Sequence, residues 1–191
     1  MYEWNATLAS TFWESLGHVE VALRNAIDRR LAQRHRRRLR SSLWVFDDAR
    51  ELGRDARGHG RHNHPYLEIQ EAQKRVRRNH KRVDGNQIVS ELPFGFWHQM
   101  LSKQQTFLWP DLAAAFPGAP DRARATVHDR VARLRTIRNR IGHHHRIWSA
   151  DVAARYDDLT DLAGYLDPDL KGYIEASSGV PTLLERYPLK R

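Results

Sequence analysis

A short basic segment near residue 140 carries the residue types best suited to chemistry on a phosphate group. A histidine titrates near neutral pH and can exchange protons with a substrate, while the fork of an arginine matches phosphate oxygens. The candidate catalytic residues are Arg138, Asn139, His143 and His144. The whole segment reads Arg138-Asn139-Arg140-Ile141-Gly142-His143-His144-His145.

The helix that must position this segment has an arginine within its apolar stripe. Apolar residues recur at helical spacing from Val127 to Ile141, and Arg138 falls inside the stripe that they form. An unpaired charge among apolar side chains is costly, so something must satisfy this guanidinium. Glu20, on the flank of the apolar stripe of the first helix, is the partner that we expect.

The geometry of the histidines depends on where this helix ends. Asn139 and His143 share a flank, but Arg138 and His143 would lie about 140° apart on an unbroken helix. Gly142 is a poor helix former, so we expect the helix to bend or end there and bring the imidazole toward the arginine. The alternative is a site assembled across two subunits.

Three segments, in order along the chain, resemble the Abi-like proteins of bacterial abortive-infection systems, a form of the HEPN superfamily. The resemblance covers residues 1–148 of a single expected domain, 1–191, and leaves 149–191 as C-terminal helices. Gly142 departs from it, because many relatives have alanine there, and so does His145, where an acidic residue often follows. The matching segments are Trp4-Asn5 with Val19–Ile27, then Glu91–Trp97, then the Arg-x(4)-His motif Arg138-Asn139-x-x-x-His143-His144 with Ile147-Trp148.

The resemblance implies an all-α, HEPN-like helical bundle that forms a homodimer, with two copies of the motif facing each other across a cleft. It also implies metal-independent RNA cleavage, in which the ribose 2′-hydroxyl attacks the adjacent phosphorus. His143 would transfer a proton and Arg138 would stabilise the phosphorane. Asn139 would orient the histidine or the phosphate, with His144 as the reserve acid–base group. The implied partners are RNA and a second copy of the chain, and a neutralising partner protein stays open. No cofactor is expected.

Two other interpretations compete with a nuclease. A non-catalytic member would bind RNA or a protein through the same groove, with one histidine capping the helix end and Arg138 as a structural ion-pair partner. A metal-dependent hydrolase could use His59, His62 and His64. Those histidines lack cysteine partners and have only Glu68 as a nearby acid, so we assign no metal to them.

The net charge favours a polyanionic partner. The 191 residues carry a formal charge of +9, almost all of it from arginine. The first helix, expected over residues 6–39, ends in a basic run from Arg29 to Arg40, although a solvated helix end is the commoner reason for such a run. The arginines that we expect to contact RNA are Arg30, Arg34, Arg37, Arg38 and Arg140.

The remaining elements are also predicted to be helical. We expect helices over 66–83 and 150–166, the latter capped by Ser149 or Asp151, and a short helix around 47–55 within a loop over 41–65. The helix after Pro117–Pro120 should have Asp121 in its first turn. Pro93 and Gly95 should break the aromatic segment 86–101, which we interpret as core. The lack of cysteine, of a secretion signal and of any apolar run of about 18 residues predicts a cytoplasmic protein without a membrane span.

Overall fold

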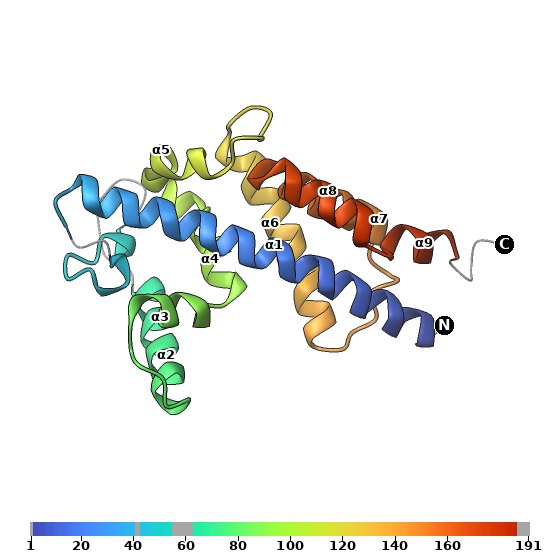
Figure 1. Cartoon of the computed structure of the whole chain (residues 1–191), viewed down its shortest axis with the longest axis horizontal. Coiled ribbons are helices and arrows are strands. Elements are labelled where there is room, and N and C mark those ends of the chain that lie inside the picture. The colour runs from blue at the N-terminus through green and yellow to red at the C-terminus, as the bar shows by residue number, and fades with distance from the viewer. Residues whose placement is uncertain (1, 41–42, 55–62, 187–191) are drawn as a thin grey trace. The chain divides into compact units, whose positions relative to one another are not determined.

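The computed structural model describes residues 2–40, 43–54 and 63–186 (Figure 1). Every regular element in these ranges is helical, which confirms the all-α prediction. No helix there combines the length and the hydropathy that crossing a membrane requires. The elements are α1 (Tyr2–Arg37), η1 (Trp44–Phe46), η2 (Glu51–Gly53), α2 (His64–Arg78), α3 (Gly85–Glu91), α4 (Phe94–Met100), η3 (Lys103–Leu108), α5 (Trp109–Leu112), η4 (Ala113–Ala115), α6 (Arg124–Gly142), α7 (Val152–Leu166), α8 (Pro168–Ser177) and α9 (Val180–Glu185).

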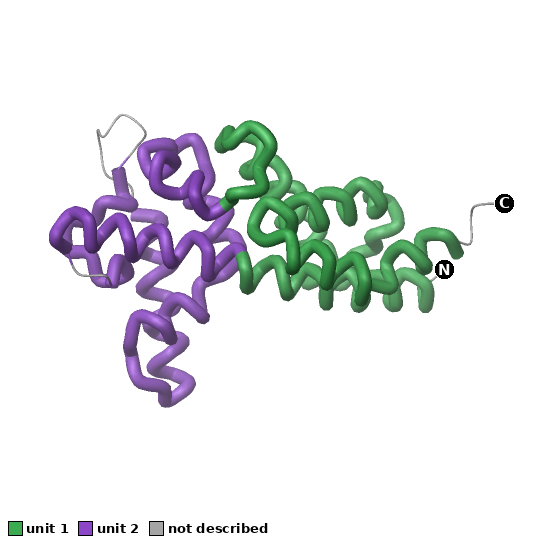
Figure 2. Tube along the Cα trace, turned by 45° about the horizontal axis from the view of Figure 1, so that its top comes forward, with its two compact units in different colours: residues 1–22, 116–191 green, residues 23–115 purple. Residues whose placement is uncertain are grey.

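The chain divides into two compact units, drawn in different colours in Figure 2. Unit 1 comprises Met1–Ala22 and Phe116–Arg191, and unit 2 comprises Leu23–Ala115. The N-terminal part of α1 belongs to unit 1 and the rest of that helix to unit 2. One domain over 1–191 stays a prediction. The histidine motif lies wholly in unit 1, and the basic run of α1 lies wholly in unit 2.

Unit 1 is a helical bundle in which α7 packs against α6, α8 and α9. The C-terminal helices are also tied to α1 by hydrogen bonds. Ser15 Oγ donates to Ser178 Oγ at 3.0 Å, and the Trp4 indole donates to the Leu183 carbonyl, also at 3.0 Å. The buried side chains of α1 and α6 in this unit recur every three or four residues, as an amphipathic helix requires. They are Leu8, Phe12, Leu16, Val19, Val127, Val131, Leu134, Ile137 and Ile141.

The starts of α6 and α7 show how local side chains position the motif helix. The sequence predicted Asp121 in the first turn of α6, but this prediction was wrong. Asp121 precedes the helix and accepts hydrogen bonds from the Ala123 amide and the Thr126 hydroxyl. The side chain of Asp151 caps α7 by accepting from the Ala154 amide at 3.1 Å, so the cap is Asp151 rather than Ser149.

Unit 2 has an aromatic core. The rings of Trp44, Phe96 and Trp97 lie within 5.0–6.2 Å of one another, centroid to centroid, and all three are at most 1% exposed. This confirms that the aromatic segment is core. The helix break occurs at Pro93, between α3 and α4, whereas Gly95 lies inside α4. Glycine weakens a helix by about 1 kcal/mol, which packing of its neighbours can offset.

Two predicted elements of unit 2 differ from the structure. In the range 47–55, where a short helix was expected, the described residues form one 3-10 turn, η2, and a second such turn, η1, precedes the range. The helix predicted to reach residue 83 ends at Arg78, because His80 adopts a left-handed conformation with φ of 55°. His59 and His62 lie outside the described residues. His64 begins α2, where its Nδ1 lies 3.0 Å from the Gln99 side-chain oxygen.

Candidate functional site

The motif helix ends at Gly142, and the chain then reverses direction through the histidines. The His144 amide donates to the Ile141 carbonyl at 2.9 Å, and the His145 amide donates to the Arg140 carbonyl at 2.8 Å. These two bonds form a Schellman motif, whose reversing residue, His144, has a φ of 56°. Glycine usually occupies that position, since a side chain there is strained. The predicted end of the helix at Gly142 is therefore confirmed.

Residues far along the chain hold this turn in place. The side-chain oxygen of Asn5 accepts a hydrogen bond from the Ile147 amide at 2.8 Å, and the Ile147 side chain is fully buried. Arg140 donates to the Arg146 carbonyl at 2.6 Å and to the Ser149 hydroxyl at 3.0 Å. The Trp4-Asn5 and Ile147-Trp148 segments thus meet in unit 1, and their contacts fix the path of the chain after the histidines.

A pocket of about 640 Å³ opens between α1 and the end of α6, entirely within unit 1. One wall comes from short or polar residues and one tryptophan of α1. The other comes from Arg138, the last turn of α6 and two of the three histidines. The lining residues are Asn5, Ala6, Ala9, Ser10, Trp13, Arg138, Ile141, Gly142, His144 and His145.

Arg138 is held in this pocket by one carboxylate and one aromatic ring. Its Nε lies 3.8 Å from the Glu20 carboxylate, the partner that the sequence predicts, and its guanidinium carbon lies 5.1 Å from the centroid of the Trp13 ring. The Nε atom is buried and makes no hydrogen bond, while a third of the side chain is exposed. A cation so placed can still turn toward an anionic ligand in the pocket.

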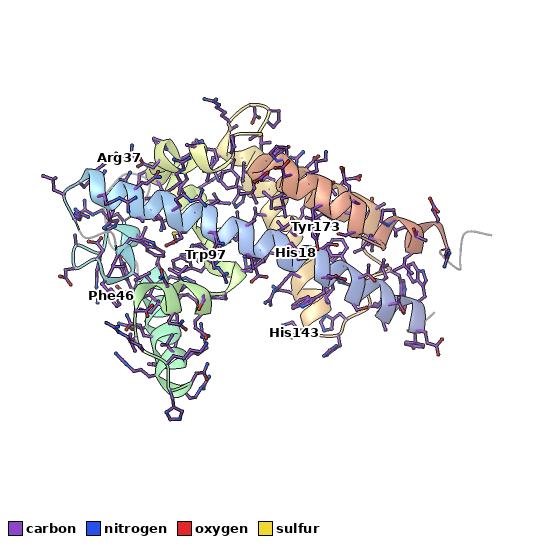
Figure 3. All side chains as sticks on the ribbon, viewed as in Figure 1. His18, Arg37, Phe46, Trp97, His143 and Tyr173 are labelled. Atoms are coloured by element: carbon purple, nitrogen blue, oxygen red, sulfur yellow. The ribbon has the colours of Figure 1, made fainter. Side chains whose placement is uncertain are left out.

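The structure brings some of the predicted catalytic residues together and leaves others apart. Arg138 and His144 line the same pocket, joined by His145, which was not among the four candidate catalytic residues. Asn139 and His143 are not among the lining residues. The His143 ring lies beside the pocket, 6.0 Å from the ring of His145 and exposed at the end of α6 (Figure 3).

Four of the seven arginines in the basic run at the end of α1 pair with carboxylates of unit 2, namely Arg34, Arg37, Arg38 and Arg40. Arg34 is 7% exposed and binds both the Glu51 carboxylate, at 2.8 Å, and that of Asp111. The more exposed Arg37 and Arg38 pair with Asp111 and Glu51, respectively. The expected role of Arg34 in RNA binding therefore needs correction, because its guanidinium is buried and committed to two carboxylates.

The pKa values in this network follow from burial and pairing. Burial alone would raise the pKa of Glu51, but the hydrogen bond from Arg34 and the nearby charges of Arg34, Arg38 and Arg40 hold it below its usual range. Burial, the largest influence, lowers the pKa of His35, which is 3% exposed. The cluster therefore favours an ionised carboxylate beside a neutral imidazole.

The same cluster has the residue types of a metal site, although their spacing in the sequence does not suggest one. Ligand atoms of His35, Asp47 and Glu51 lie within 4.8 Å of one another. However, Arg34, Arg38 and Arg40 already surround the carboxylates, and a divalent cation would have to displace them. We interpret the cluster as an ion-pair network that fastens the 43–54 segment to α1.

Two further residues of the motif pocket were missed as site residues. Trp13 stands on the opposite wall from the histidines and Asn5 at its edge, and both are far from the motif along the chain. Spacing on α1 could have suggested Trp13, since the residue lies outside the apolar positions Phe12 and Leu16 and is 40% exposed.

Of the remaining arginines predicted to contact RNA, Arg30 donates to the Gln33 side chain at 2.9 Å and to the Ala114 carbonyl.

The comparison with known proteins identifies a family whose matched range contains all the residues that line the pocket. No curated protein and no solved structure matches the chain. The profile of the Abi-like protein family, in contrast, matches residues 1–149. This range includes both walls of the pocket, the histidine turn and the α1 residues that hold it. The chain belongs to the Abi-like protein family.

Proposed function

We propose that this protein is a metal-independent endoribonuclease of the HEPN type that acts in an abortive-infection or toxin-like system. The observation that carries the proposal is the pocket of unit 1, where Arg138 converges with His144 and His145. An arginine that lies between an aromatic ring and a carboxylate 3.8 Å away, with a third of its side chain exposed, is suited to an anionic ligand. Membership of the Abi-like family supports a role in phage defence.

The reaction needs two proton transfers and one fixed cation. The 2′-oxygen forms a bond to phosphorus while the bond from phosphorus to the 5′-oxygen breaks, giving a 2′,3′-cyclic phosphate and a 5′-hydroxyl. One imidazole takes the proton of the 2′-hydroxyl and another protonates the leaving oxygen, which are roles for His143 and His144. Arg138 stabilises the charge of the phosphorane, and Asn139 orients the reacting groups.

A second copy of the chain would complete the site. His143 and Asn139 lie beside the pocket rather than in it. In a dimer whose two α6 helices face each other, these residues would reach an RNA bound between the two copies. We expect an interface that includes residues 123–144. A protein that sediments only as a monomer at high concentration would argue against this arrangement.

Arginine contacts would add affinity for RNA without selectivity, because phosphates carry no sequence information. We propose this role for Arg30, Arg37, Arg38 and Arg140. Arg34 is left out because it is buried and paired with two carboxylates. Charge reversal at Arg37 and Arg140 should weaken binding to unrelated RNAs about equally.

The test is incubation of the purified protein with total bacterial RNA, with and without EDTA, followed by mapping of the product ends. We expect EDTA-resistant cleavage that leaves cyclic phosphate and 5′-hydroxyl ends. Loss of activity in EDTA would instead indicate a metal-dependent hydrolase. Binding without cleavage would favour the second candidate, a non-catalytic RNA-binding module that uses the same pocket.

A further inference from the structure

We propose that the pocket of unit 1 is a nucleobase subsite, in which one unpaired base stacks on Trp13 beside the phosphate that Arg138 holds. The substrate class that follows is single-stranded RNA. This inference rests on the proposed function for the identity of the ligand. It adds a recognition site that the Arg-x(4)-His motif does not itself contain.

The first support is the exposed ring of Trp13. Trp13 is 40% exposed and lies outside the buried apolar stripe to which Phe12 and Leu16 belong. The other exposed large apolar side chains of α1 in this unit are Tyr2 and Val21, and neither lines the pocket. The side chains around Trp13 are small. Ala6 and Ala9 lie on the same wall, and a Cβ added at Gly142 would lie 3.8 Å from the ring. The small neighbours leave space around an aromatic surface, as a stacking platform requires.

The second support is the cation beside the ring. The guanidinium carbon of Arg138 lies 5.1 Å from the Trp13 centroid, so a ligand on the ring is also next to a positive charge. A nucleotide combines a planar aromatic base with an anionic phosphate a few ångströms away, and it satisfies both groups together. A purely apolar ligand would leave Arg138 and the two imidazoles without a partner in the pocket.

The third support is the hydrogen-bonding pattern at the edge of the pocket. The Asn5 side-chain oxygen accepts from the Ile147 amide, which leaves its NH₂ group to donate to a ligand. The hydroxyl of Ser10 donates to the Thr7 carbonyl and can still accept a hydrogen bond. Donors and acceptors at the rim of an apolar pocket are suited to the edge of a base. A base within a duplex is stacked and paired, so only an unpaired base can enter.

The test measures binding rather than cleavage. The probe is a short 2′-O-methyl RNA oligonucleotide, which lacks the nucleophilic hydroxyl and cannot be cleaved. We would compare it with versions that carry one abasic nucleotide at each position in turn, and with its duplex. The wild-type protein should lose roughly tenfold or more in affinity at one abasic position, within the range that stacking supplies, and should bind the duplex less tightly.

Variants of Trp13 test whether its ring causes the loss of affinity at the abasic position. Trp13→Leu should remove the dependence on that base, whereas Trp13→Phe should keep most of it. Tyr173→Leu is the matched control, because Tyr173 is a 53% exposed aromatic of the same unit whose ring contacts the His18 ring edge-on and does not line the pocket (Figure 3). Circular dichroism would establish that each variant is folded.

The outcomes separate this inference from the proposed function. Equal affinity for all abasic probes overturns the subsite even if the protein cleaves RNA. A position-specific loss that Trp13→Leu abolishes supports the subsite even if the protein cleaves nothing. If Trp13→Leu converts a dimer to a monomer and the abasic scan is flat, a second copy covers the ring and the subsite is refuted.

Discussion

Two arginine-bearing helix ends show how differently the same side chain is used in this protein. At the end of α1, in unit 2, Arg34 is buried between Glu51 and Asp111. At the end of α6, in unit 1, Arg138 has one carboxylate at 3.8 Å, an aromatic ring, and an open pocket. Arg34, although it belongs to the longer basic run, is therefore the less available of the two for a phosphate.

The density of positive charge along a sequence therefore does not measure how much of that charge is available to a ligand. The run from Arg29 to Arg40 is the most basic stretch of α1, yet Asp111 and Glu51 pair with Arg34, Arg37 and Arg38 within it. The isolated arginine in an apolar stripe was the better signal, since its cost there required an explanation. Four predictions sharpen this comparison.

The largest expected effect is on RNA cleavage at the α6 end. Arg138→Ala, His143→Ala and His144→Ala should each lower kcat/KM by about 10²–10⁴-fold, the range for a lost acid–base group or charge stabiliser. Arg138→Lys should fail as well, because an ammonium lacks the guanidinium fork. His145→Ala should have a smaller effect.

The control for these variants is His18→Ala, which removes an exposed imidazole of unit 1 that contacts Tyr173 instead of the pocket. Its activity should match the wild type. Robust, EDTA-resistant cleavage by a folded Arg138→Ala, His143→Ala double variant would place the active site elsewhere.

The second prediction concerns stability and compares the buried Arg34 with the exposed Arg37 of the same basic run. Arg34→Ala should lower the free energy of unfolding by about 3–5 kcal/mol, because it leaves two largely buried carboxylates without this partner. Arg37→Ala, at a side chain that is 64% exposed, should cost at most about 1 kcal/mol. Urea denaturation would measure both, and similar losses would show that burial does not distinguish the two ion pairs.

The third prediction is a smaller, pH-dependent effect at the α1 end. The folded protein lowers the pKa of His35 below its ordinary 6.5, so the unfolded chain binds a proton first as the pH falls. Stability from His35 is therefore present above about pH 6.5 and is lost progressively below it. His35→Gln should flatten the dependence of unfolding free energy on pH between 6.5 and the region below 4.5, where Glu51 begins to titrate. An exposed control, His80→Gln, should leave the slope unchanged.

The smallest effect is expected from the backbone of the two helix ends. Leu39, like His144, reverses its helix with a positive φ, here 54°, and its side chain is 97% exposed. Leu39→Gly should stabilise the protein by up to about 1 kcal/mol, as relief of the strain exceeds the extra entropy of glycine. Thermal unfolding would show the gain. His144→Gly should give a similar gain with loss of activity, and a loss of stability in both would mean that the left-handed residues are not strained.

Local sequence patterns were enough to predict the main helices and the location of the motif. Apolar repeats located α1, α6 and α7, Pro93 marked a break, and Gly142 marked the end of the motif helix. These features depend on residues within a few positions of one another, because helical periodicity and capping are local. Leu39, His80 and His144 end their helices without glycine, so their reversal was not predictable from residue type.

Which charges remain available to a ligand, and which side chains face Arg138, depend on contacts between residues far apart in the sequence. Arg34 meets Glu51, 17 residues away, and Asp111, 77 residues away. Trp13 and Asn5 reach the motif only because α1 packs beside α6. Spacing on α1 could mark Trp13 as lying outside the apolar stripe, but it could not place either residue in the pocket. The physical reason is that ion pairing and pocket formation depend on distance in space. Helical periodicity fixes which face of a helix is buried, but not which side chains of other elements it meets.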